Sequence, residues 1–453
     1  MKTIIAKNTW LAEAGLRLDA SYHLSEGNIS KVLIHKSPYD ISIIRDFSDR
    51  IFYGGRSKRV YVANLNKGVP FISSSDMLKS DLKSIKSVSK KYTISLDSTL
   101  LKKDWILVSR SGTVGNTTYT NADFEGKAAS EHIIRIIPNQ NIKSGFLYAY
   151  LSSKIGFSLL TQGIFGAVIQ HIEPEHIENI PIPNFPNEFQ QQIQNLIIES
   201  GELRVEGNQL LEDAIGLFEN RIGSTKVSIS SQNEIISVSK IRSFLSRFDA
   251  QYQIITKKLD IEKCTSIEYE KISTFAKRIF VGNRGKRNYV ENGIPFLSSS
   301  DMILFNPKRY AKQISQRTPS LNNLLVNRND ILISRSGTVG NVVLVGNDLK
   351  NSAVSEHALR LEIDDSKIAP EYIFCYLKTK QGKMYMEASA FGSVIITLNE
   401  DLIGNIDVPM LTKDDRDFIV SKIKIYIEKL DLATLKENQA IQLVEKEIEQ
   451  WQN

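Results

Sequence analysis

The chain has 453 residues, of which 42% are hydrophobic and 24% are charged, and its formal net charge is +6. These values are ordinary for a globular protein of two or three domains, and no run approaches the roughly 20 apolar residues of a membrane span. Its two cysteines, Cys264 and Cys375, are too few for a disulfide framework or a zinc site with four cysteine ligands. The amino-terminal sequence reaches polar Asn8 too early for a secretory signal. The scarcity of cysteines indicates a reducing compartment and hence predicts a cytoplasmic location.

Three blocks of the sequence occur twice, always in the same order and at the same offset. Pro70–Met77 returns as Pro295–Met302, Ile106–Asn116 returns as Ile331–Asn341, and Ser130–His132 returns as Ser355–His357. The offset is far longer than the roughly 20–50 residues of a solenoid repeat. The sequence therefore predicts one whole domain present in two copies.

Each copy predicts a mixture of short strands and helices, and hence an α+β domain. Trp105–Ser109 and Ile331–Ser334 are short β-branched runs that end in polar, glycine-containing turns, as strands do. Helix-like stretches follow at Phe146–Lys154 and Tyr372–Lys380. The predicted boundaries are 1–186 for the first domain, 187–225 for a central helix, 226–412 for the second domain and 413–453 for a carboxy-terminal helix.

Both predicted long helices carry apolar residues at heptad spacing, which is typical of coiled coils. In the first helix they include Phe189, Ile193, Leu196, Leu203 and Leu210, and in the second Ile423, Ile427, Leu430, Ile441, Val444 and Ile448. Thirty helical residues form a rod of about 45 Å. Each helix could pack only on its own domain, but two matched apolar stripes favour an antiparallel pair.

The chain resembles the specificity subunit of type I restriction–modification systems over essentially its whole length. The resemblance lies in Ile180–Pro183 leading into Phe189–Ile193, and in the Ile331–Thr338 block. Each motif is short, and their order, repeated twice, makes the resemblance specific. The second copy departs from the pattern, because it keeps only Pro409 of the proline-rich exit and its helix opens with Asp414–Phe418.

The resemblance implies two target-recognition domains related by a pseudo-twofold and separated by two long antiparallel coiled-coil helices. It implies a non-catalytic subunit that reads a bipartite, asymmetric sequence in double-stranded DNA. Such a subunit recruits two copies of an adenine methyltransferase and, in the full complex, a restriction and translocation subunit. The partners would bring S-adenosylmethionine, ATP and Mg²⁺, and no cofactor is expected on this chain.

Two groups of basic residues lie at matching places in the two copies. The first is Arg56, Lys58 and Arg59 in copy one and Arg284, Lys286 and Arg287 in copy two. The second is Lys83, Lys86, Lys90 and Lys91 in copy one and Lys308, Arg309, Lys312 and Arg317 in copy two. In the first group the neighbouring glycines let the backbone approach a phosphate, and the guanidinium and ammonium groups neutralise it. The second group differs strongly in sequence between the two copies. The alternative for the first group is an ordinary solvated turn.

Residues that are identical in both copies cannot explain two different half-sites. We therefore expect base reading in the divergent stretches 78–100 and 303–325, with arginine contacting guanine and asparagine or glutamine contacting adenine. Arg110 and Arg335, which lie in an identical block, are expected to be structural or to bind phosphate.

The sequence contains no recognisable catalytic motif, and we expect the chain to perform no chemistry. No base is implied beside Ser111 or Ser336, and His132 and His357 are expected to be structural. Three other hypotheses remain. One is a system whose cutting and methylation share one partner polypeptide. Another is a coiled-coil scaffold whose duplicated domains bind protein. The last is an enzyme that handles phosphate through its Ser-Arg-Ser-Gly-Thr loop.

Overall fold

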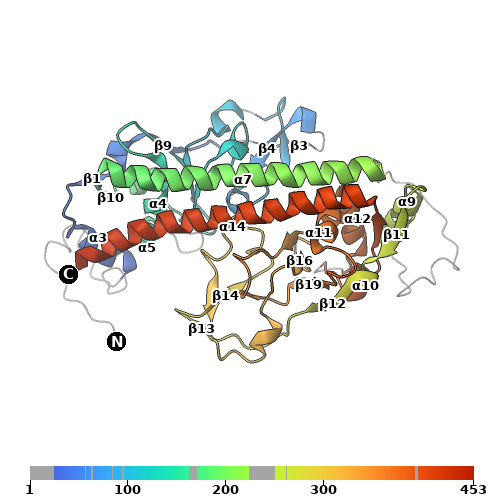
Figure 1. Ribbon diagram of the computed structural model, residues 1–453. Coiled ribbons are helices and arrows are strands. Elements are labelled where there is room, and N and C mark those ends of the chain that lie inside the picture. Colours follow the sequence, from blue (N-terminus) through green and yellow to red (C-terminus); the bar gives the residue numbers. More distant parts are fainter. Residues whose placement is uncertain are drawn as a thin grey trace. The chain divides into compact units, whose positions relative to one another are not determined.

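The computed structural model describes residues 25–56, 58–62, 65–83, 85–93, 96–162, 171–223, 250–261, 263–392 and 396–452. The chain forms two compact units (Figure 1). Unit 1 consists of residues 1–205 and 432–453, and unit 2 consists of residues 206–431. Each unit contains one copy of the repeat and a part of each of two long helices, α7 (Asn187–Ile222) and α14 (Lys413–Glu449).

Two four-stranded sheets form the centre of unit 1, and the one with the longer outer strands is called the larger sheet. The larger sheet is antiparallel and has the order β2 (Ser48–Tyr53), β9 (Ile133–Pro138), β6 (Ile106–Ser109) and β7 (Thr117–Tyr119). The smaller sheet has the order β3 (Tyr61–Val62), β5 (Ser87–Ser89), β4 (Gly68–Ile72) and β8 (Ala128–Ala129). Its last pair, β4 and β8, is parallel.

Unit 2 repeats this topology strand for strand. Its larger sheet has the order β12 (Ala276–Val281), β19 (Ala358–Ile363), β16 (Ile331–Ser334) and β17 (Val342–Leu344). Its smaller sheet has the order β13 (Tyr289–Val290), β15 (Lys312–Ile314), β14 (Ile294–Leu297) and β18 (Ala353–Val354), again with a parallel last pair. The predicted duplication of one α+β fold is confirmed.

A two-stranded ladder closes each repeat beside the start of a long helix. In unit 1, β1 (Ile41–Ile43) pairs antiparallel with β10 (Pro181–Pro183). In unit 2, β11 (Glu268–Lys271) pairs antiparallel with β20 (Asp407–Met410). The first and last described strands of each repeat therefore lie side by side. The shorter helices are α3 (Glu26–Ile34) and α6 (Pro174–Glu178) in unit 1, and α9 (Ala250–Ile261), α10 (Ile272–Phe275) and α13 (Glu400–Gly404) in unit 2.

Each unit also contains a helical elbow that packs against its larger sheet. The elbows are α4 (Ser144–Ser152) with α5 (Lys154–Gln162), and α11 (Pro370–Lys378) with α12 (Lys380–Ser389). In unit 2 the Thr379 hydroxyl donates to the Tyr376 carbonyl at 2.6 Å and accepts from the Gly382 amide at 3.1 Å. The Thr379 side chain thus satisfies a free carbonyl at the end of α11 and a free amide at the start of α12. In unit 1 Ser153 makes the equivalent bonds.

Each unit has a buried arginine at the equivalent place in its larger sheet. Arg135 of β9 is fully buried and donates to the carbonyl of Ala129 in β8 at 2.7 Å. Desolvation lowers its pKa to about 10. In unit 2 Arg360 of β19 donates to the Leu324 carbonyl at 2.9 Å, and its Nε lies 3.8 Å from a carboxylate oxygen of Asp330. Arg135 therefore joins the two sheets directly, whereas Arg360 reaches the smaller sheet through the Leu324 carbonyl, which also accepts from the Val354 amide of β18.

Asp330 gives unit 2 a stability that depends on pH. Burial raises the pKa of its carboxyl from 3.8 to about 6, so the folded state favours the protonated form. This contribution is fully present below about pH 4 and is lost as the pH rises through about 6. We expect the stability of the wild type relative to Asp330→Asn to fall by about 1–2 kcal/mol between these values, because one pKa unit corresponds to about 1.4 kcal/mol. Urea unfolding at four pH values measures this difference, and parallel curves would contradict it.

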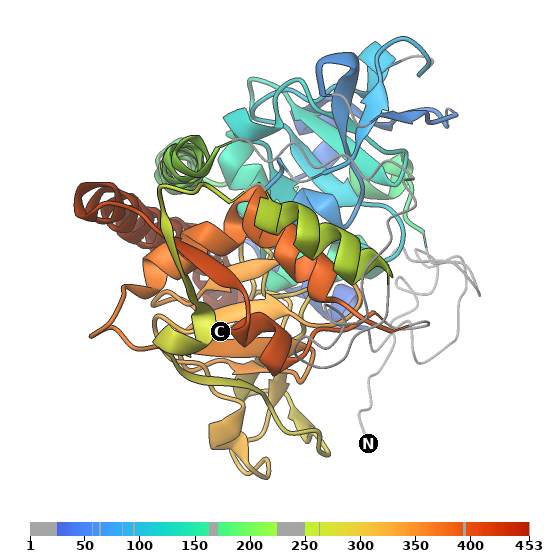
Figure 2. The same ribbon diagram turned by 90° about the vertical axis from the view of Figure 1, so that its right-hand side faces the viewer.

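The two long helices run antiparallel within each unit (Figures 1 and 2). In unit 1 Glu199 pairs with Lys436 at 2.9 Å and Arg204 with Glu437 at 2.7 Å. In unit 2 the pairs are Glu206–Lys429, Asp213–Lys422 and Arg221–Asp415, at 2.5, 3.4 and 2.9 Å. Residue numbers in unit 2 rise along α7 as they fall along α14, which confirms the predicted direction.

More of the predicted heptad residues are buried on α14 than on α7. On α14 the residues Ile423, Ile427, Ile441, Val444 and Ile448 are buried and Leu430 is half-buried. On α7 only Ile193 of the predicted residues is buried, whereas Phe189, Leu196, Leu203 and Leu210 are half-buried. The neighbouring Ile197, Leu211 and Phe218 are buried instead.

The apolar face of α7 is wider than a coiled-coil seam because the helix packs on its own unit as well as on α14. In unit 2 the ring centroid of Phe218 lies 5.0 Å from that of Tyr372 and 5.5 Å from that of Tyr376, both in α11. In unit 1 the Gln194 side chain accepts a hydrogen bond from the Gly145 amide of α4 at 2.5 Å. Both packing arrangements considered from the sequence therefore occur together.

Candidate nucleic-acid interface

The most similar block of the two copies forms the hairpin loop that joins β6 to β7 and β16 to β17. Gly112 and Gly115 have φ of 83° and 89°, and Gly337 and Gly340 have φ of 80° and 85°, a region that other residues rarely adopt. The Ser109 hydroxyl donates to the Thr113 carbonyl and accepts from the Asn116 amide at 2.9 Å. Ser334 makes the same two bonds in unit 2. Turn geometry therefore accounts for the near identity of this block.

The second repeated block is a turn of the same kind. The Ser73 amide and hydroxyl both donate to the Asp76 carboxylate, at 3.1 and 2.5 Å. The Ser298 amide and hydroxyl donate to the Asp301 carboxylate, at 2.8 and 2.7 Å. This block, too, is explained by the turn that it forms at the end of β4 or β14.

A serine and a histidine contact each other in both units, contrary to the expectation that no base lies beside these serines. The distance from Ser111 Oγ to His132 Nδ1 is 2.6 Å, and that from Ser336 Oγ to His357 Nδ1 is also 2.6 Å. The other ring nitrogen of His132 lies 3.6 Å from the Glu131 carboxylate. The histidine side chains are 38% and 49% exposed, so they lie at the surface rather than in the core.

The serine–histidine pair does not have the geometry of a hydrolytic triad. In such a triad the serine contacts Nε2 and the acid contacts Nδ1, and here the two ring nitrogens are exchanged. Glu131 is also engaged, because it accepts a hydrogen bond from Arg59. Burial alone would raise the pKa of Glu131, but its backbone hydrogen bond and Arg59 together hold it below its ordinary value.

Two of the predicted phosphate contacts turn toward the protein. Arg59 donates to Glu131, and its guanidinium lies 4.7 Å from the centroid of the Phe71 ring. In unit 2 the Arg287 guanidinium lies 5.3 Å from the Phe296 ring and 3.6 Å from the Glu356 carboxylate, with only 9% of the side chain exposed. Both arginines therefore support the segment in which they lie, which joins β2 to β3 in unit 1 and β12 to β13 in unit 2.

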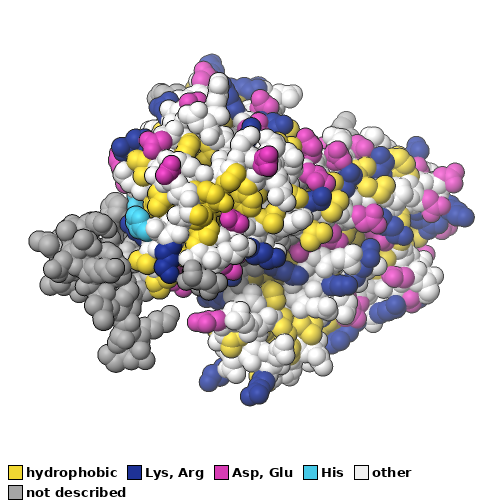
Figure 3. Space-filling view, turned by 60° about the vertical axis from the view of Figure 1, so that its left-hand side comes forward, with side chains coloured by type: hydrophobic (Ala, Val, Ile, Leu, Met, Phe, Trp, Pro, Cys, Tyr) yellow, Lys and Arg dark blue, Asp and Glu magenta, His cyan; other side chains and the backbone are white. Residues whose placement is uncertain are grey.

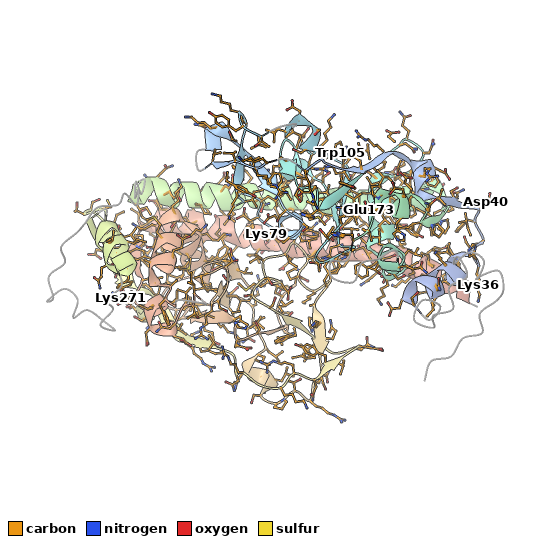
Figure 4. All side chains as sticks on the ribbon, turned by 180° about the vertical axis from the view of Figure 1, so that it is seen from behind. Lys36, Asp40, Lys79, Trp105, Glu173 and Lys271 are labelled. Atoms are coloured by element: carbon orange, nitrogen blue, oxygen red, sulfur yellow. The ribbon has the colours of Figure 1, made fainter. Side chains whose placement is uncertain are left out.

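Arg110 and Arg335 also make contacts within the protein. Arg110 donates to Glu173 (labelled in Figure 4) and lies 4.2 Å from the centroid of the Tyr53 ring. The Nε of Arg335 donates to the Leu398 carbonyl at 2.8 Å. These contacts favour the structural role for both residues, one of the two roles predicted from their identity in the two copies.

The other basic residues predicted to bind DNA differ in exposure. The exposed ones are Arg56, Lys58, Lys83, Lys86, Lys90 and Lys91 in unit 1, and Arg284, Lys286, Lys312 and Arg317 in unit 2. Lys308 and Arg309 are half-buried. Lys308 lies 3.9 Å from Asp348, and Arg309 lies over the Tyr310 ring. Figure 3 shows lysines and arginines spread among acidic and apolar side chains on the face in view, without one continuous basic field.

Exposed tyrosines accompany two of these lysines, and the sequence alone gave them no role. Tyr61 of β3 is 51% exposed and Tyr289 of β13 is 54% exposed. The Lys86 amino group lies 5.8 Å from the centroid of the Tyr61 ring, and that of Lys312 lies 5.3 Å from the Tyr289 ring. The signal that could have found them is the matching position of both tyrosines, two residues after Arg59 and Arg287.

The described residues offer neither a metal site nor a membrane helix. Among them, no group of three or more histidine, cysteine, aspartate or glutamate side chains could hold a metal ion. Over the same ranges, no helix combines the length and the apolar composition needed to cross a bilayer.

Comparison with known proteins gives a family and several matching solved structures. The sequence model of the family described as "Type I restriction modification DNA specificity domain" matches residues 53–197 and 270–443, which is more than half of the chain. No curated protein matches the chain in sequence.

Solved structures similar to the chain include the S subunit of a type I restriction–modification system from M. genitalium. It is 14% identical, with 92% of this chain and 96% of that chain covered and a TM-score of 0.34. The HsdS subunit from Thermoanaerobacter tengcongensis is 13% identical, with 91% and 96% covered and a TM-score of 0.29. A chain from a study of complex assembly and conformational transition of the type I R-M system is 13% identical, with 91% and 98% covered and a TM-score of 0.29.

Proposed function

The chain belongs to the type I restriction–modification DNA specificity family, and from this premise we propose that each of its two repeats reads one half of a bipartite, asymmetric DNA site. The chain is thus a DNA-recognition subunit. The observation that carries the proposal is that the family match falls in two segments, 53–197 and 270–443, and that these contain the two copies of one fold.

The asymmetry of the proposed site rests on where the two copies differ. The blocks that they share are turns held by their own hydrogen bonds, such as those of Ser109 and Ser73. The stretches 78–100 and 303–325 differ strongly in sequence and carry exposed basic side chains. Two repeats that share a scaffold but differ in the surface that contacts the bases are suited to two different half-sites.

The proposed partners are two copies of a DNA adenine methyltransferase and, in the full complex, restriction and translocation subunits. We assign the chemistry to them, together with S-adenosylmethionine, ATP and Mg²⁺, and the chain itself is proposed to be non-catalytic. The inverted contacts of His132 with Ser111 and Glu131 support this assignment. The complex would act on DNA in the cytoplasm.

Replacing the divergent stretch of the second repeat tests whether each repeat reads one half of the DNA site. We expect replacement of residues 303–311 and 315–325 by those of another family member to change one half of the methylated sequence and to leave the other half intact. Strand β15 (Lys312–Ile314) is kept, because it pairs with both β13 and β14 and holds the smaller sheet together. The graft is made in the full chain, co-expressed with the methyltransferase of its own system, and methylated adenines are mapped by sequencing.

The matched control is the equivalent graft in the first repeat, which replaces the divergent stretch 78–100 but keeps β5 (Ser87–Ser89) and Lys86 before it, the register counterparts of the residues kept in the second repeat. It should change the other half of the methylated sequence. A change in both halves from either graft would refute the modular assignment. Binding of the wild-type chain to protein partners but not to duplex DNA would instead support the scaffold hypothesis.

A further inference from the structure

The lysine–tyrosine pairs of the two repeats occupy equivalent positions in the smaller sheets. Tyr61 is the Cα partner of Val88, and Tyr289 is the Cα partner of Ile314. The prolines of the repeated block fix the same register, because Pro70 pairs with Ser87 and Pro295 pairs with Gln313. The residue before Ser87 is Lys86, and the residue before Gln313 is Lys312. These two lysines are therefore structural counterparts.

The equivalence is hidden in the sequence because the surrounding residues diverge. Lys86 is followed by Ser87 and Val88, whereas Lys312 is followed by Gln313 and Ile314. The two lysines nevertheless lie over equivalent tyrosines, at 5.8 and 5.3 Å from the ring centroids. Each lysine thus keeps its place within a variable stretch, beside a tyrosine of the neighbouring strand β3 or β13.

Each lysine–tyrosine pair lies beside an equivalent phenylalanine and arginine of its own unit. In unit 1 the Phe71 amide donates to the Lys86 carbonyl at 2.9 Å, and Arg59 lies under the Phe71 ring. In unit 2 Phe296 is the Cα partner of Lys312, and its ring contacts Tyr289 edge-on with centroids 6.4 Å apart. The buried side of each cluster thus consists of a phenylalanine and an arginine that is paired with a glutamate.

The outer side of each cluster presents a cation to solvent. Lys86 and Lys312 are exposed, and among the described residues neither forms an ion pair. An aromatic ring beside an exposed lysine contributes about 0.5–1 kcal/mol and limits the directions in which the ammonium group points. The arrangement therefore holds an uncompensated positive charge in one place in each repeat.

A protein that reads two different half-sites still meets the same sugar–phosphate backbone at both. A feature that is superposable in the two repeats cannot read different bases, and a fixed, unpaired cation suits a phosphate. We propose that Lys86 and Lys312, each held by its tyrosine, are equivalent phosphate contacts that bind DNA irrespective of sequence. The inference rests on the proposed function and removes these two lysines from the base-reading set in which their divergent stretches placed them.

The test is made with the full chain in complex with the methyltransferase of its system. The Kd is measured for a duplex that carries the methylated sequence and for an unrelated duplex, between 50 and 300 mM salt. We expect Lys86→Gln and Lys312→Gln each to weaken both complexes about fivefold at 0.15 M salt, and the double variant about 30-fold, since each contact releases about 0.9 counterions. The slope of log K against log salt should become shallower by about 2 in the double variant.

Further variants separate the charge from the ring. Lys86→Arg with Lys312→Arg should retain the salt slope, because the charge is kept. Tyr61→Leu with Tyr289→Leu should weaken both complexes by a smaller factor and leave the slope unchanged. The control is Lys422→Gln on α14, where a lysine likewise lies 5.2 Å from the centroid of an aromatic ring, that of Phe418, but has its charge compensated by Asp213 at 3.4 Å. Its affinity for both duplexes should equal that of the wild type.

Two results would overturn the proposal. The first is an unchanged affinity of the double variant for both duplexes, which would make the pairs ordinary surface contacts. The second is a loss confined to the specific duplex together with a changed base in the methylated sequence, which would make the lysines base readers. Failure of the wild type to prefer its methylated sequence would instead refute the proposed function, so the two failures are distinguishable.

Discussion

Replacing Glu437 by alanine is expected to lower the free energy of unfolding of unit 1 by about 3–5 kcal/mol, because a buried charge loses its partner. Only 1% of the Glu437 side chain is exposed. It accepts hydrogen bonds from the Tyr148 hydroxyl of α4 and from Arg204 of α7, the latter at 2.7 Å. The substitution leaves the Arg204 guanidinium, which is 15% exposed, without its carboxylate. Urea unfolding followed by far-ultraviolet circular dichroism measures the loss.

The control uses a second ion pair between the same two helices. Glu199 pairs with Lys436 at 2.9 Å, but their side chains are 46% and 26% exposed. Glu199→Ala should therefore cost no more than about 1 kcal/mol, as exposed ion pairs do. Glu437→Gln should lie between the two, since it keeps the shape and one acceptor oxygen but removes the charge and the second acceptor. Equal costs for Glu437→Ala and Glu199→Ala would show that burial of the pair is unimportant.

Replacing Gly382 by alanine is expected to destabilise unit 2 by about 3 kcal/mol or more, since overpacking against fixed atoms is costly. A Cβ at this position would lie 2.3 Å from the carbonyl oxygen of Tyr376 and 2.7 Å from the Cα of Leu377. Both are backbone atoms, so no side chain can move aside. The equivalent Gly156 in unit 1, whose Cβ would lie 2.0 Å from the Tyr150 carbonyl oxygen, should behave in the same way.

Gly216 supplies the matched control for the elbow glycines. It lies within α7, and a Cβ added there would meet no atom within 4 Å. Gly216→Ala should stabilise the chain by up to about 1 kcal/mol, because alanine favours the helix over glycine by that amount. Thermal unfolding of the two variants should therefore shift in opposite directions. A stabilising effect of Gly382→Ala would contradict the steric argument.

The sequence predicted the architecture well because its signals are local or repeated. The duplication was evident because each turn block occurs twice. Short apolar runs predicted strands at Trp105–Ser109 and Ile331–Ser334, and the structure has them at Ile106–Ser109 and Ile331–Ser334. The buried apolar stripe of α14 was predicted correctly, because its apolar residues follow the heptad spacing closely. That of α7 was displaced because Ile197 and Leu211 stand beside heptad leucines, and periodicity alone does not choose between adjacent apolar residues.

The details of the candidate interface depend on contacts between residues that are distant in sequence. Arg59 was predicted to face a phosphate, yet it bonds to Glu131, which lies in another strand connection. No local pattern announces such a pair. The contact between Ser111 and His132 was missed for the same reason. The equivalence of Lys86 and Lys312 became visible only from strand register, since the residues that follow them differ.

The ladders that close each repeat have a consequence for how such chains can diversify. Because β1 lies beside β10 and β11 beside β20, each repeat starts and finishes at neighbouring points in space. Three residues or fewer separate its final strand, β10 or β20, from α7 or α14. Recombination with junctions in these short strands would exchange a whole repeat as a cassette. The ion pairs that set the register of the rods, such as Asp213–Lys422, would be inherited unchanged. A new DNA target could thus be acquired in one genetic step without redesigning the part of the molecule that joins the two readers.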